Sequence, residues 1–139
     1  MGCVAADGAP VSHRRVSDAA RLALEETVSR LRHKIPNGIQ WVKPEGVHLT
    51  LKFLGNVRAG LAGELLSSLS VPALASPPFQ VRLSGLGMFP NPRSPRVLWA
   101  GVDGDLAALS KLQGTVEDAA SVLGLPRDQR PFSPHLTLG

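Results

Sequence analysis

The sequence predicts an α+β fold that is roughly duplicated within the chain. The tetrapeptide His-Leu-Thr-Leu occurs twice, at residues 48–51 and 135–138, and a proline closely precedes each copy. Around these copies, some segments have an apolar residue at every second position, which predicts a strand, and others have apolar residues with a period of 3.6, which predicts a helix. The predicted order is strand-helix-strand-strand-helix and then strand-strand-helix-strand. This mixture of elements is typical of the α+β class, and it assigns one copy of the tetrapeptide to each half.

The elements of the first half follow from periodicity and from turn residues. They are a helix over 17–34, a short strand over 39–42, a strand over 47–53 and a helix over 58–70. The first helix has a single apolar stripe, formed by Ala20, Leu24, Val28 and Leu31. Residues 71–78 contain three prolines, so we expect them to be a connector between the halves.

The second half begins with a half-buried strand from Phe79 to Ser84 and continues after a proline-rich loop with a buried strand over 97–102. Asp105 is a suitable N-cap for a helix that runs to about Leu123. The second tetrapeptide follows as the last strand.

Both copies of the tetrapeptide place a histidine and a threonine on the same face of a strand. In the first copy, Val47, Leu49, Leu51 and Phe53 alternate with His48, Thr50 and Lys52. In the second copy, Leu136 and Leu138 alternate with His135 and Thr137. Residues two apart on a strand lie ~6.6 Å apart, so one phosphoryl group can contact both a ring nitrogen and the neighbouring hydroxyl.

Together the two polar faces make a pocket suited to acid–base chemistry on a phosphate. One imidazole can accept a proton while the other, kept charged, donates one. The hydroxyls of Thr50 and Thr137 can donate hydrogen bonds to the non-bridging phosphate oxygens. Lys52 shares the polar face of His48 and is a candidate substrate contact, although a solvated surface lysine fits the pattern equally well.

A structural role and a metal site are the competing interpretations of the two histidines. A single histidine on a strand is usually structural, but repetition of the whole tetrapeptide on polar faces argues against this role. Two imidazoles can also bind zinc, yet no carboxylate lies at ligand spacing and the one cysteine is Cys3. We therefore expect neither a metal nor a cofactor.

Composition restricts the class of protein. The 139 residues are 43% hydrophobic and 19% charged, as expected for one globular domain over 1–139, with halves of roughly 1–70 and 79–139. No segment resembles a membrane span or a signal peptide, and a single cysteine suits the reducing cytoplasm. The net charge of +4 mildly favours polyanionic partners, and we expect a monomer.

Three segments carry a family resemblance. His48–Gly55, Phe89–Gly101 and Pro131–Gly139 resemble the 2H phosphoesterases, above all the RNA 2′,3′-cyclic phosphodiesterases, also called 2′-5′ RNA ligases. The resemblance implies two lobes, antiparallel sheets that line a central cleft, helices outside, and a first strand near residues 3–7. It also implies that this chain is short at its C-terminus relative to the family.

The resemblance further implies roles for the site residues. His48 would donate a proton to the leaving 3′ oxygen, His135 would accept a proton from water, and Thr50 and Thr137 would hold the phosphate. The implied substrate is RNA with a terminal 2′,3′-cyclic phosphate, and the product is a 2′-phosphate end. Three alternatives remain: ligation of 2′-5′ junctions, hydrolysis of a small cyclic phosphate such as that of ADP-ribose, and an inactive truncated remnant that binds RNA ends.

Overall fold

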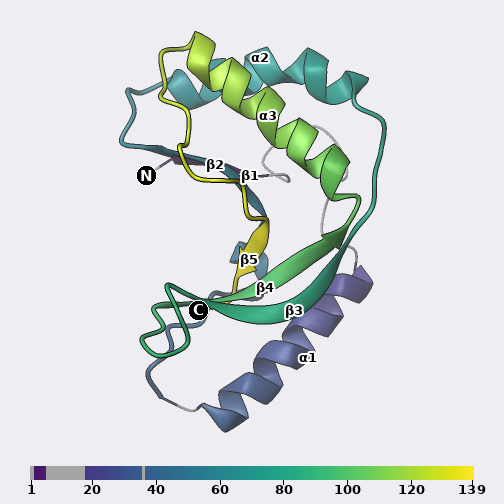
Figure 1. Ribbon diagram of the computed structural model, residues 1–139, viewed down its shortest axis with the longest axis vertical. Helices are drawn as coiled ribbons and strands as arrows, with labels where there is room; N and C mark the ends of the chain where they lie inside the picture. The colour runs from purple at the N-terminus through teal and green to yellow at the C-terminus, as the bar shows by residue number, and fades with distance from the viewer. Residues whose placement is uncertain (1, 6–17, 36) are drawn as a thin grey trace.

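The computed structural model describes residues 2–5, 18–35 and 37–139, which form an α+β fold as predicted (Figure 1). The strands are β1 (Gly2–Ala5), β2 (Thr50–Gly55), β3 (Val81–Phe89), β4 (Val97–Gly104) and β5 (His135–Thr137). The helices are α1 (Asp18–Lys34), a short 3-10 helix η1 (Pro44–Gly46), α2 (Leu61–Ala75) and α3 (Leu106–Val122). No helix in the described ranges is both long and apolar enough to cross a membrane.

The strands form two antiparallel sheets that meet at the tetrapeptides. β1 pairs with β2, and the other sheet has the order β3-β4-β5. An antiparallel bridge between Leu49 and Leu136 joins the sheets. Helices α2 and α3 lie together over β1 and β2, while α1 lies along the three-stranded sheet (Figure 1).

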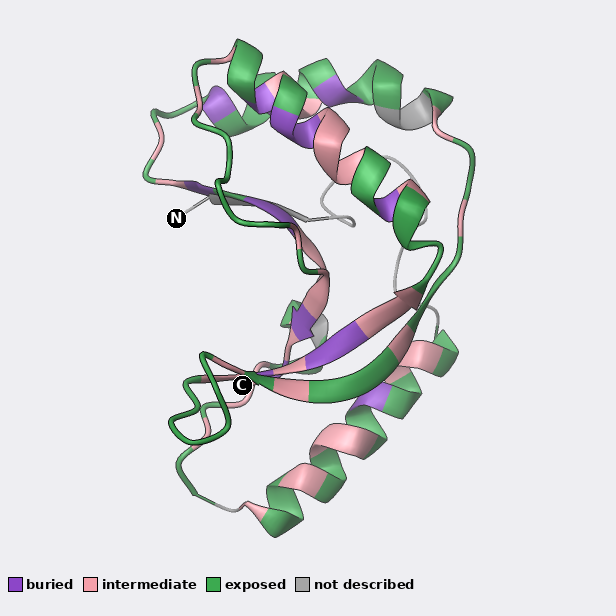
Figure 2. Ribbon diagram, in the orientation of Figure 1, coloured by how far each residue is buried: buried purple, intermediate pink, exposed green. Residues whose placement is uncertain are grey.

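Two hydrophobic clusters hold the helices on the sheets (Figure 2). The buried residues of the cluster under α2 and α3 are Leu51, Leu54, Leu65, Leu69, Leu109, Val116 and Ala120. Those of the cluster under α1 are Leu24, Leu98, Ala100, Leu136 and Leu138. Each cluster takes residues from both sequence halves, so burial of apolar side chains ties residues 1–70 to residues 79–139.

The ends of the helices were predicted correctly at some positions and wrongly at others. Asp105 caps α3 as predicted, because its Oδ1 accepts a hydrogen bond from the backbone N–H of Ala108 at 3.1 Å. The prediction that residues 71–78 are a connector is wrong for the first part of that range, because α2 continues to Ala75 with Pro72 inside it. A proline inside a helix costs ~3 kcal/mol, and burial of Leu65 and Leu69 in the same helix offsets this cost.

The strands differ from the prediction in three places. The strand predicted over 47–53 is β2, which begins only at Thr50, so His48 has no strand assignment and Leu49 forms an isolated bridge. The segment 39–42 has no strand assignment, although its Val42 N–H donates to the Leu138 carbonyl at 2.8 Å. β3 begins at Val81 and runs to Phe89, and most of its residues are exposed instead of half-buried. β3 is an edge strand with β4 as its one neighbour in the sheet, which accounts for this exposure. The proposed first strand is present at Gly2–Ala5, whereas residues 6, 7 and 17 of the predicted elements lie outside the described ranges.

Candidate active site

The two tetrapeptides lie side by side. In the antiparallel bridge between Leu49 and Leu136, the residues that flank one leucine lie opposite those that flank the other. Each histidine therefore lies opposite the threonine of the other copy. Because side chains alternate along a strand, these four residues share the face opposite to the two leucines. They are the sequence-predicted site residues His48, Thr50, His135 and Thr137, and all four are half-buried.

The pairing sets the separation of the histidines. His48 and His135 are diagonal neighbours across the two strands, a relation that corresponds to roughly 7–8 Å between backbones. The bridge thus brings the two copies of the tetrapeptide next to each other.

Both imidazole rings are oriented by the same backbone contact. Nδ1 of His48 lies 2.7 Å from the carbonyl oxygen of Gly46, and Nδ1 of His135 lies 2.7 Å from that of Ser133. A carbonyl oxygen can only accept, so Nδ1 carries a proton in both rings. The second nitrogen, Nε2, is therefore the atom left to exchange a proton with a substrate. The sequence contained no signal for these contacts beyond the proline that precedes each copy.

The threonine hydroxyls remain available. Within the described part of the chain, neither Thr50 nor Thr137 has a side-chain hydrogen bond to protein. The neighbouring Leu136 and Leu138 are 4% and 0% exposed, which anchors the second strand from its opposite face. The hydroxyl of Thr137 is thus held on a buried strand with its donor free, as binding of a phosphate oxygen requires.

Two aromatic side chains lie beside the second histidine. The ring of Phe89 lies 5.1 Å from that of His135 in an edge-on arrangement, and Trp99 lies 6.1 Å from the same ring. Phe89 and Trp99 also contact each other at 5.1 Å. The indole of Trp99 occupies the space where a side chain at position 87 would begin, so Gly87 is required there. The sequence alone does not reveal these neighbours, because the register of β3 on β4 brings them together.

Lys52 is not placed as the sequence suggested. Its ammonium donates to Glu117 Oε2 and to the carbonyl of Pro126, each at 2.9 Å, and both Lys52 and Glu117 are 7% exposed. Lys52 does not share the face of Thr50 because the pairing of β1 with β2 is irregular between these two residues. Val4 pairs with Lys52 and the next residue, Ala5, pairs with Thr50, so β2 has one extra residue at this point. The expectation of a substrate contact is therefore replaced by a buried ion pair between β2 and α3.

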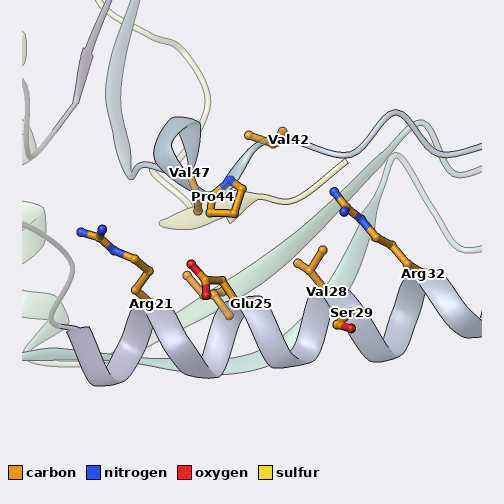
Figure 3. A pocket seen from close by; sticks show the side chains of 9 residues that line it. Arg21, Glu25, Val28, Ser29, Arg32, Val42, Pro44 and Val47 are labelled. Carbon is orange, nitrogen blue, oxygen red and sulfur yellow. The ribbon is translucent and has the colours of Figure 1, made fainter.

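A groove lies between α1 and the segment 42–47, just before the first tetrapeptide (Figure 3). Its volume is about 410 Å³, and its apolar lining is Leu24, Val28, Val42, Pro44 and Val47. Arg21 and Arg32 stand near its two ends, with Glu25 between them (Figure 3). Val47 precedes His48, so the two side chains point to opposite sides of the chain, and the groove is separate from the histidine pair.

Among the described residues, no group of three or more His, Cys, Asp or Glu side chains is arranged to hold a metal ion.

Comparison with known proteins finds a family and several relatives that match this chain. The profile of the family described as LigT like Phosphoesterase matches residues 16–99. The RNA 2′,3′-cyclic phosphodiesterase of Geobacillus stearothermophilus is 42% identical over 98 residues, which are 70% of this chain and 31% of that protein. The protein of the same name from Aquifex aeolicus is 33% identical over 119 residues, which are 84% of this chain and 63% of that protein. The chain therefore spans less than two thirds of the length of these relatives.

Solved structures agree with the fold. The crystal structure of TT0787 of Thermus thermophilus matches with a TM-score of 0.76 and 32% identity, over 88% of this chain and 68% of that one. The crystal structure of Escherichia coli LigT complexed with 3′-AMP matches with a TM-score of 0.61 and 31% identity, over 84% of this chain and 65% of that one.

Proposed function

The chain belongs to the LigT-like phosphoesterase family, and on that premise we propose that it hydrolyses 2′,3′-cyclic phosphates at RNA ends to 2′-phosphates without a metal ion. The relatives named above are RNA 2′,3′-cyclic phosphodiesterases, which supports this choice of substrate. The proposal rests on one observation above all. The bridge between Leu49 and Leu136 gathers two histidines and two threonines on one face.

The proposed reaction uses Nε2 of each ring. A water oxygen attacks phosphorus and loses a proton to Nε2 of His135, while the bond from phosphorus to the 3′ oxygen breaks. Nε2 of a protonated His48 donates its proton to that leaving oxygen. One P–O bond forms and one breaks. After the reaction His135 is protonated and His48 is neutral, and proton exchange with solvent returns both rings to their starting states.

Each ring is suited to this exchange because its other nitrogen is already occupied. The carbonyls of Gly46 and Ser133 hold the Nδ1 protons in place, so gain and loss of a proton occur at Nε2 alone. The hydroxyls of Thr50 and Thr137 donate to the non-bridging oxygens, where negative charge increases as water attacks. The donor and acceptor roles follow the family resemblance, since the two histidines have the same backbone contact.

Substitution of the histidines tests the proposal. His48→Ala and His135→Ala are each expected to lower kcat by about 10²–10⁴-fold on an oligoribonucleotide with a 2′,3′-cyclic phosphate end. The folded state should persist in both variants, as judged by circular dichroism. His33→Ala is the matched control, because His33 is exposed near the end of α1 and its Nδ1 contacts the Ser29 carbonyl of the same helix.

Two further readouts define the reaction. Turnover should survive EDTA and should have a bell-shaped pH dependence, because one imidazole must be charged while the other is neutral. Phosphorus NMR should identify the product as a 2′-phosphate. Full activity in both His48→Ala and His135→Ala, or loss of activity in EDTA that zinc restores, would refute the proposal.

A further inference from the structure

The connection between β3 and β4 is a short loop with a defined conformation. We call residues 90–96 the arginine loop; three of its seven residues are proline, whose φ angle is fixed by the ring. Asn91 Oδ1 accepts hydrogen bonds from the backbone N–H groups of Arg93 at 3.0 Å and Ser94 at 3.1 Å. The N–H of Arg96 donates to the Phe89 carbonyl at 2.7 Å, which closes the loop at its base. The loop therefore loses little conformational entropy when a ligand binds.

The two arginines of this loop are unpaired. Arg93 and Arg96 are exposed, and neither has a carboxylate partner among the described residues. The loop itself contains no acidic residue. Elsewhere in the described chain five arginines do have such partners, in the pairs Arg30–Glu26, Arg58–Glu64, Arg82–Asp103, Arg127–Asp118 and Arg130–Asp128. An unpaired guanidinium retains its full capacity for bidentate binding of a phosphate.

The arginine loop begins beside the histidine pair. Phe89, the last residue of β3, contacts the ring of His135 at 5.1 Å. At the other end of the loop, Leu98 of β4 donates its N–H to the carbonyl of Gly139 at 2.7 Å, just beyond β5. The loop projects from the end of the sheet at which the chain terminates (Figure 1). A polyanion that places its terminal phosphate at His135 therefore has the loop next to it.

We propose that the arginine loop binds the RNA strand one to two nucleotides upstream of the terminal cyclic phosphate, through the phosphates of the backbone. This inference rests on the proposed function, which places that terminal phosphate between His48 and His135. Phosphate contacts position a strand without reading its sequence. The contact would therefore make the enzyme favour oligonucleotides over mononucleotides, whatever the sequence of the RNA.

A binding experiment tests the loop separately from catalysis. The probe is a fluorescein-labelled hexaribonucleotide that ends in a 2′-phosphate, measured by fluorescence anisotropy over a series of salt concentrations. The double substitution Arg93→Gln/Arg96→Gln should raise Kd about fivefold to tenfold at low salt. It should lower the slope of log K against log salt by about 1.4, since each lost contact with single-stranded RNA removes about 0.7. Wild-type affinity should rise from mononucleotide to trinucleotide and then level off.

A control of equal charge separates a local contact from a general electrostatic effect. Arg82→Gln/Lys111→Gln removes two exposed positive charges at the far end of β3 and on α3, and should change the slope much less. An unchanged Kd in Arg93→Gln/Arg96→Gln, an equal loss in the control, or no binding of the hexanucleotide by the wild type would each overturn the inference. Arginine-dependent binding without turnover would instead refute the proposed function and leave the loop assignment in place.

Discussion

The buried ion pair between Lys52 and Glu117 gives the sharpest prediction about stability. Both residues are 7% exposed, and the pair joins β2 to α3. The carboxylate also has a second donor, because Gln113 Nε2 donates to Glu117 Oε1 at 3.2 Å. The lysine also holds the carbonyl of Pro126, at the start of the segment that leads to β5. Removal of one partner leaves the other charge buried without compensation.

The expected cost follows from this arrangement. Lys52→Met leaves the Glu117 carboxylate with one remaining donor and removes the donor to Pro126, so we expect a loss of ~3–5 kcal/mol in the free energy of unfolding. For a domain of this size that corresponds to a fall in Tm of roughly 10–20 °C. The double variant Lys52→Met/Glu117→Leu replaces both charges with apolar groups of similar size, and should recover most of the loss.

Thermal and urea unfolding followed by circular dichroism measure these values. Arg30→Met is the matched control, because the Arg30–Glu26 pair is exposed and should contribute less than about 0.5 kcal/mol. A wild-type stability in Lys52→Met, together with a large rise in KM, would mean that the lysine contacts substrate after all. That result would refute both the structural role and the correction to the sequence-based prediction.

Two other predictions concern single positions. Gly87→Ala should displace the Trp99 indole, lower the free energy of unfolding by about 1–3 kcal/mol and shift the tryptophan fluorescence. Gly114→Ala on α3 is the control, because there is open space around Gly114, and it should leave the stability unchanged or raise it. The pKa of Asp103 is lowered first by the hydrogen bond from the backbone N–H of Gly104 and then by Arg82. The ionised Asp103 carboxylate therefore stabilises the fold at pH values above the pKa that it has in the unfolded chain. This stabilisation is lost as pH falls through the lower pKa of the folded state. Carbon-13 NMR titration of Arg82→Gln should show a partial rise of that pKa, and an unchanged value would contradict the assigned cause.

The elements that were predicted correctly depend on local signals. The limits of α3 follow from the Asp105 cap and the apolar stripe, and those of α1 from its own stripe, so neighbours along the chain were sufficient. α2 was predicted too short because Pro72 is a strong local stop signal, whereas tertiary burial of the same helix decides the outcome. Lys52 was assigned to the wrong surroundings for a similar reason. Its partner Glu117 lies 65 residues away, and no local pattern reports that distance.

The repeat itself shows what a short motif can and cannot encode. The same four residues produce the same ring contact in both copies, since each histidine binds the carbonyl two residues before it. The difference between the copies comes from outside the repeat. His135 contacts Phe89 and Trp99 on β3 and β4, whereas no aromatic ring among the described residues contacts His48. If the two histidines have different roles in a proton transfer, the surroundings supplied by the second sheet must distinguish them, because the tetrapeptide does not.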